Sequence, residues 1–158
     1  MSKLLKIIKL SLIISIITGC AYEPIFLKKS YDFKIEEINL NGDKNVNSIL
    51  NNKLRFIKNN TAKNLKKYFI SLNTERERKV ISKDSKGDPS KFEISIITNY
   101  KISDDQKLLV SREIKQTNIY NNNSDKFKLE QSEKIIIDYL SEKIAETIIS
   151  SIINLNDN

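Results

Sequence analysis

Residues 92–102 have the sequence Phe-Glu-Ile-Ser-Ile-Ile-Thr-Asn-Tyr-Lys-Ile, in which every second residue, beginning with the phenylalanine, is apolar or threonine. A period of two over this length is typical of a β-strand that turns one side toward an apolar core. The segment therefore predicts a long strand with one buried side. That side consists of Phe92, Ile94, Ile96, Thr98, Tyr100 and Ile102.

A second strand is predicted upstream of this segment. Tyr68, Ile70 and Leu72 alternate in the same way, and the strand continues into the charged run 75–78. Residues 82–90 contain glycine and proline and predict the loop between the two strands.

A third strand is predicted downstream. Residues 103–107 are polar and predict a hairpin turn, after which residues 108–120 favour a strand. The alternation in this strand is poorer, so we expect an edge strand or one that buries only one end. The run Asn-Asn-Asn-Ser at 121–124 ends it.

The first strand of the domain is predicted near residues 31–40. Its apolar residues alternate from Tyr31 to Ile35, and the alternation resumes on the opposite parity at Ile38. This change predicts a β-bulge across Glu36-Glu37. The sequence Asn-Gly-Asp at 41–43 predicts a turn directly after the strand.

Two helices complete the pattern. Apolar residues recur at helical spacing from Val46 to Ile57, and Asn45 is the predicted N-cap of this helix. A longer helix is predicted near the C-terminus, with Ser124 as its cap and Asp125 at its positive end. Charged residues interrupt this second helix, which argues against a membrane span. Its apolar stripe consists of Ile137, Leu140, Ile144, Ile148, Ile152 and Leu155.

The predicted order of elements is β-α-β-β-β-α. Two amphipathic helices and one sheet with a single apolar face make a two-layer α+β sandwich. We therefore expect a single domain over 31–158, in which a four-stranded, mostly antiparallel (mixed) sheet packs against two helices. The β-α-β start predicts one parallel strand pair, because a helical crossover joins parallel strands.

The N-terminus has the features of an export signal. Three lysines precede an apolar run at 10–17, which is far too short to span a bilayer. The run ends in Ile-Thr-Gly-Cys, and Cys20 is the single cysteine of the chain. This sequence resembles the lipobox of bacterial lipoproteins, which implies a signal peptide at 1–19, acylation of Cys20 and a lipidated tether at 20–30. Two or more acyl chains anchor a protein stably.

The composition argues against most catalytic chemistry. The chain has no histidine, and its single cysteine cannot form a thiolate metal site. The three glycines form no phosphate-binding loop. Paired carboxylates occur at Glu36-Glu37 and Asp104-Asp105, in strand or turn contexts. We therefore expect a protein that is not an enzyme and that uses no metal and no cofactor.

The basic character of the chain does not indicate a nucleic-acid partner. The formal net charge is +7, but it comes mainly from lysine in a chain that is also rich in asparagine and isoleucine, all of which have A/T-rich codons. Arginine, whose planar fork suits phosphate, occurs at only four positions. Export also argues against nucleic acid.

Taken together, these features resemble a known family. The lipobox, the start Cys-Ala-Tyr-Glu-Pro-Ile-Phe at 20–26, the element order, and the segment Asn-Tyr-Lys-Ile-Ser-Asp at 99–104 are similar to the LPS-assembly lipoprotein family LptE, in its alphaproteobacterial branch. The chain departs from that branch at Ala21, where the family has glycine, and in the loop before the strongest strand, where the arginine usual in the family has no clear match.

The resemblance implies a non-enzymatic outer-membrane lipoprotein. Members of this family plug the β-barrel of the LPS-transport porin LptD, assist the assembly of that barrel and bind lipopolysaccharide (LPS). Family members place basic ligand contacts before the third strand and at the start of the last helix. The matching positions here are Lys83, Lys86, Lys126 and Lys128. Solvated surface lysines are the simpler interpretation of each.

Arg76 and Arg78 form a second candidate surface. Alternation places both on one side of their strand, with Glu77 and Lys79 on the other. This pattern is typical of a solvated or edge-protecting face, and the alternative is a stripe that binds an anionic ligand such as LPS. Two other functions stay open: a lipid carrier, which would need more apolar residues, and an envelope scaffold or accessory lipoprotein without a lipid ligand.

Overall fold

The computed structural model describes residues 33–58 and 65–156, and it confirms the predicted order of elements. The predicted signal 1–19, the tether 20–30 with Cys20, and Tyr31 lie outside the described residues. The elements are β1 (Phe33–Gly42), α2 (Lys44–Lys58), β2 (Lys66–Lys83), β3 (Pro89–Ser103), β4 (Leu108–Asn121) and α3 (Lys126–Asn156).

The four strands form one sheet in the order β1-β2-β3-β4. β1 and β2 are parallel, as the crossover through α2 requires, and the β2–β3 and β3–β4 pairs are antiparallel. The predicted bulge is present, because the β1–β2 register shifts between Ile35 and Glu37. β4 is a terminal strand, as its weak alternation indicated.

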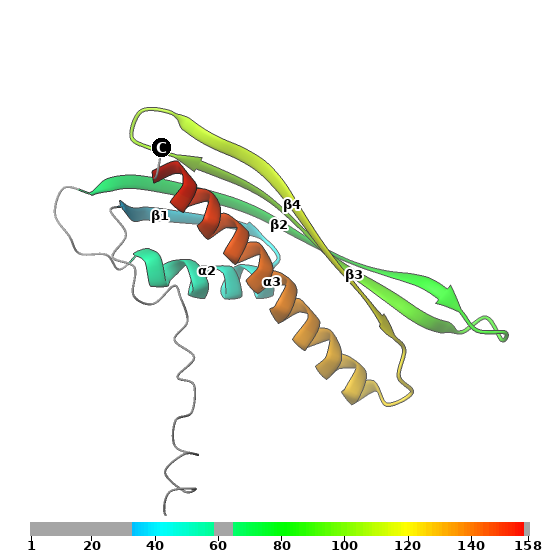
Figure 1. The fold of residues 1–158 in the computed structure, drawn as a ribbon. Coiled ribbons are helices and arrows are strands. Elements are labelled where there is room, and N and C mark those ends of the chain that lie inside the picture. Colours follow the sequence, from blue (N-terminus) through cyan, green and yellow to red (C-terminus); the bar gives the residue numbers. More distant parts are fainter. Residues whose placement is uncertain (1–32, 59–64, 157–158) are drawn as a thin grey trace, which may run out of the picture. The chain divides into compact units, whose positions relative to one another are not determined.

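Both helices lie on one side of the sheet, and the core fills the space between the two layers (Figure 1). The alternating residues 92–102 supply its centre, since Phe92, Ile94, Ile96, Thr98, Tyr100 and Ile102 are all buried. The α3 stripe is confirmed as well, with its most buried members at Leu140, Ile144, Ile148 and Ile152. Among the described residues, no helix is both long enough and apolar enough to cross a membrane.

Both predicted helix caps were wrong by a small displacement in sequence. Asp43, rather than Asn45, caps α2: its Oδ1 accepts hydrogen bonds from the backbone N–H of Asn45 and of Val46, each at 3.0 Å. Asp125, rather than Ser124, caps α3 through the backbone N–H of Phe127 at 3.1 Å. In each case a carboxylate adds charge at the positive end of the helix, which the neutral side chain would not supply.

The loop between β2 and β3 is shorter than the predicted 82–90. β2 continues to Lys83 and β3 begins at Pro89. Asp84 closes the hairpin: its backbone N–H donates to the carbonyl of Asp88 at 2.8 Å, and its own carbonyl accepts from Gly87 N–H at 3.1 Å. Figure 1 shows this hairpin reaching beyond the start of α3.

Candidate functional site

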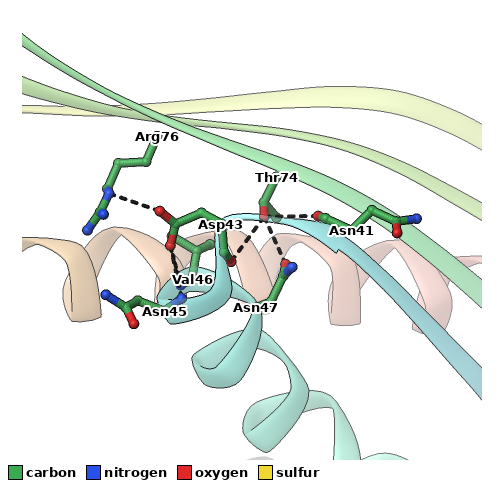
Figure 2. Close-up of polar contacts among 7 residues, drawn as sticks. All are labelled: Asn41, Asp43, Asn45, Val46, Asn47, Thr74 and Arg76. Atoms are coloured by element: carbon green, nitrogen blue, oxygen red, sulfur yellow. Dashed lines mark hydrogen bonds and ion pairs between the residues drawn. The ribbon is translucent and has the colours of Figure 1, made fainter.

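A polar junction joins the end of β1, the start of α2 and the middle of β2 (Figure 2). Gly42 takes a φ of +97° there, which lets the chain turn out of the sheet and into the helix. Thr74 Oγ1 donates to the Asn47 side-chain oxygen at 2.8 Å, and both side chains are buried. The junction thus fixes where α2 leaves the sheet.

Arg76 extends the junction toward the helices. Its Nε lies 3.1 Å from Oδ2 of Asp43, the same carboxylate that caps α2 with its other oxygen. One aspartate therefore holds both a helix N-terminus and a guanidinium. The charge of Arg76 is balanced inside the chain.

Arg78 is held by three partners from three different elements. Its Nε lies 2.9 Å from Glu133 Oε1 on α3 and donates to Tyr120 Oη on β4 at 3.0 Å. Its guanidinium carbon lies 3.7 Å from the centroid of the Phe92 ring on β3, a cation–π contact. Tyr120 Oη in turn donates to Glu133 Oε1 at 2.6 Å.

These contacts locate the predicted arginine pair. The alternation is confirmed, because Arg76 and Arg78 contact groups on the helix side of the sheet, and Glu77 and Lys79 pair with each other at 2.6 Å. Sequence reasoning did not find the partners Asp43 and Glu133, because each lies on another element. Both arginines act in this structure as ties between the sheet and the helix layer.

A cavity of about 460 Å³ opens beside these ties, between α2, α3 and β2. Its lining contains two basic and three acidic side chains, so it presents no single sign of charge. Within the part of the chain that the structure describes, no cluster of three metal-ligating side chains exists. The lining residues are Asn45, Ile49, Arg76, Glu130, Glu133, Lys134, Ile137 and Asp138.

The four lysines implied by the family resemblance lie at one end of the sheet. Lys83 is opposite Pro89 at the end of β2, and Lys86 lies in the following turn. The Asn122 side chain donates to the Pro89 carbonyl at 2.7 Å, which holds the chain just before α3 against the same hairpin. Lys126 and Lys128 therefore begin α3 at that end.

These lysines differ in their pairing. Lys128 lies 3.6 Å from Asp125, in an exposed i,i+3 pair. No carboxylate of the described residues lies within 4.0 Å of the ammonium groups of Lys83, Lys86 or Lys126. All four are exposed, so their charges are open to a ligand. Together they are called the lysine end below.

The paired carboxylates have structural partners. Glu36 forms an ion pair with Lys34 at 2.7 Å. Asp104 accepts hydrogen bonds from the backbone N–H groups of Gln106 and Lys107, each at 2.8 Å, and these bonds lower the pKa of its carboxyl group. Asp104 therefore builds the β3–β4 turn.

The half-buried phenol of Tyr120, which contacts Arg78, gives a pH-dependent prediction. Burial, together with the hydrogen bond to Glu133, raises the pKa of Tyr120 to about 12. An unfolded tyrosine titrates near pH ~10. Above that pH the unfolded chain loses this proton before the folded chain does, so the free energy of unfolding should fall between about pH 10 and 12.

Ultraviolet titration of phenolate in the native chain and in Tyr120→Phe checks this, the difference between the two curves being the titration of Tyr120. Glu133→Gln should move that titration toward lower pH. A difference curve centred near pH 10 in the native chain would contradict the tie.

Comparison with known proteins identifies the fold. No family model matches the sequence, and no curated protein matches it. Solved structures of three bacterial lipoproteins share the architecture at low sequence identity.

The rare lipoprotein B of Shewanella oneidensis is 15% identical, with 75% of this chain and 98% of that chain covered at a TM-score of 0.53. An uncharacterized lipoprotein B of Nitrosomonas europaea is 16% identical, with 79% of this chain and 86% of that chain covered at a TM-score of 0.59. A minor lipoprotein of Acinetobacter baumannii is 13% identical, with 75% of this chain and 94% of that chain covered at a TM-score of 0.52. The likeness spans nearly the whole of each of these proteins and shows a shared fold.

Proposed function

We propose that this chain is an outer-membrane lipoprotein of LPS assembly, which plugs the LptD-type β-barrel, assists its assembly and binds LPS on its way to the outer leaflet. The observation that carries the proposal is the fold, which is shared with proteins described as lipoproteins over 86% and 98% of the lengths of two of them. The lipobox at Cys20 supports the same assignment from the sequence.

The helix-free side of the sheet suits a polar barrel lumen. Asn73 on β2 is opposite Asn99 on β3, which is opposite Glu113 on β4, and all three side chains are exposed. Ser71, Lys101 and Ser111 form the next such row. The lumen of an outer-membrane barrel is polar and hydrated, so a rigid sheet with these polar rows is suited to fill it.

The lysine end supplies the chemistry for LPS. Lipid A presents phosphate groups, and lysine ammonium groups bind phosphate through charge-assisted hydrogen bonds. The arginine pair contributes less to this site, since Arg76 and Arg78 already pair with carboxylates. We therefore place the ligand contacts on Lys83, Lys86, Lys126 and Lys128.

The experiment that tests the assembly role is affinity purification of the tagged full chain from solubilised membranes. We expect a large β-barrel protein to co-purify, and depletion of the chain should lower the amount of correctly assembled barrel and stall LPS delivery. Recovery of the chain without any β-barrel would count against the LPS-assembly role.

Ligand binding is tested separately by charge reversal. Replacing Lys83, Lys86, Lys126 and Lys128 together by Glu should weaken LPS binding about tenfold or more, because a hydrogen bond to a charged group is worth roughly 1.5–3 kcal/mol. Since all four side chains are exposed, the fold should be unchanged.

The matched control reverses four exposed lysines elsewhere on the chain, at Lys66, Lys67, Lys101 and Lys107. This variant has the same net charge and should retain binding. Equal loss in both variants would show that net charge alone governs binding, and full binding by the first variant would exclude the lysine end.

A scaffold without a lipid ligand is the second candidate. The balanced pairing of Arg76 and Arg78, and the mixed charges around the cavity, favour it. Co-purification with a transport complex together with no binding of LPS would support the scaffold instead.

A further inference from the structure

The two edges of the sheet are built differently. β1 ends at Gly42, opposite Thr74, so the outer edge of β2 from residue 75 to residue 83 pairs with no other described strand. This edge is densely charged, and four of its six charged residues form ion pairs within the chain: Arg76 with Asp43, Arg78 with Glu133, and Lys79 with Glu77. Charged side chains on an edge strand discourage pairing with another chain.

The edge of β4 lacks this protection. β4 pairs only with β3 among the described strands, and its register is regular from Val110, opposite Ile102, to Asn121, opposite Lys91. It contains no proline, and no charged residue occurs in its last six positions, 116–121. A long, regular and weakly charged edge is a template for an added strand.

The charged residues of β4 form no close ion pair with the other described residues. Arg112, Glu113 and Lys115 are exposed, and within the described part of the chain none of them forms an ion pair within 4.0 Å. Glu113 and Lys115 lie on the same, helix-free side of the strand, one on each side of Ile114 along the chain.

We propose that β4 pairs with β4 of a second copy of this chain, antiparallel and centred on Ile114. A two-fold axis at Ile114 places Glu113 of each copy opposite Lys115 of the other, so the dimer contains this ion pair twice. Directly opposed, oppositely charged residues stabilise antiparallel strands. The result is a continuous eight-stranded sheet with an isologous interface.

The remaining pairs of this register are compatible. Residues related by the axis have numbers that are both odd or both even, so residues on the helix side of one copy are opposite residues on the helix side of the other. The backbone N–H and C=O groups that point outward from each β4 can then form hydrogen bonds with those of the other copy. Arg112 is opposite Gln116, Ser111 is opposite Thr117, and no two like charges face each other. A centre at Lys115 would instead place two ammonium groups opposite each other, so the charge pattern selects Ile114.

Self-complementarity is the reason for choosing a second copy over an unrelated strand. Both members of the ion pair come from one strand, so the surface needs no feature that this chain lacks. The inference does not depend on the proposed role in LPS assembly, because it rests on the β4 edge alone.

The test is sedimentation equilibrium of the full chain in density-matched detergent. We expect a monomer–dimer equilibrium. Glu113→Lys should weaken the dimer about tenfold or more, because each copy then places a lysine opposite Lys115. Lys115→Glu should do the same, and the double variant Glu113→Lys with Lys115→Glu should restore the dimer.

The control is Glu75→Lys, the same charge change at an exposed position on the β2 edge, which should leave the dimer unchanged. Far-ultraviolet circular dichroism of every variant separates loss of pairing from loss of fold. Any of three results would overturn the proposal. The native chain could be monomeric at all concentrations, the dimer could be unaffected by both single charge reversals, or the double variant could dimerise as weakly as the single variants. A different protein found paired along β4 would overturn it in favour of that partner.

Discussion

Substitution of Gly42 by alanine should unfold much of the domain. A Cβ at this position would lie 1.8 Å from the Thr74 carbonyl oxygen and 2.8 Å from the Thr74 carbonyl carbon, both backbone atoms of the central part of β2. The φ of +97° adds strain for any residue with a side chain. The backbone must move, and the turn, the Asp43 cap and the Thr74 junction move with it. We expect a loss of about 4 kcal/mol or more in the free energy of unfolding.

Gly87 offers the matched control for this substitution. Its φ is +90°, similar to that of Gly42, but a Cβ there meets no atom within 4 Å. Gly87→Ala should therefore cost only the backbone strain, about 1–2 kcal/mol. Urea denaturation of both variants measures the difference. Equal losses would show that backbone strain, rather than the close approach of β1 to β2, is what makes a side chain at position 42 unfavourable.

The second large effect concerns the centre of the core. Ile96 on β3 and Ile144 on α3 are both fully buried, with 0% of the surface of each exposed. Replacing either by alanine removes buried apolar atoms and leaves a cavity, which should cost about 2–5 kcal/mol.

The control for the core is Ile135→Ala on α3, a residue that is 68% exposed. That change should alter the free energy of unfolding by no more than about 0.5 kcal/mol. A loss below about 0.5 kcal/mol at Ile96 or Ile144 would contradict the burial of these two side chains in the core.

Local periodicity explains why most of the fold was predictable. The alternation from Phe92 to Ile102 and the helical stripe through Ile144 each reflect one buried side, and burial confirms both. The bulge after Ile35 was also visible, because an inserted residue shifts the parity of every residue after it.

The polar contacts were less accessible from the sequence. The sequence Asn-Gly-Asp predicts a turn at Asp43, but the two further roles of this residue depend on α2 and on Arg76, which the fold brings together. The carboxylate partner of Arg78 is Glu133, which lies 55 residues further along the chain, in the N-terminal half of α3. Periodicity gives the side of a strand on which a residue lies, but it does not give the residue opposite.

The candidate lysines could also be selected from the sequence, but their arrangement in space could not. Sequence resemblance selected Lys83 and Lys126 from separate segments, and the contact of Asn122 with Pro89 brings these segments to one end of the sheet. Strand order could not be deduced, because several orders satisfy one apolar face and short hairpins.

The parallel pairing of β1 with β2 has a consequence for the order of folding. β2, β3 and β4 form two consecutive β-hairpins, so the first contacts of each strand pair, next to its turn, close only a short loop. Phe33 instead pairs with Lys66, and the whole of α2 must be accommodated between them. Closing the longer loop costs more entropy and slows folding. We therefore expect the three-stranded meander to form first and to act as the template on which the N-terminal β1–α2 segment docks last.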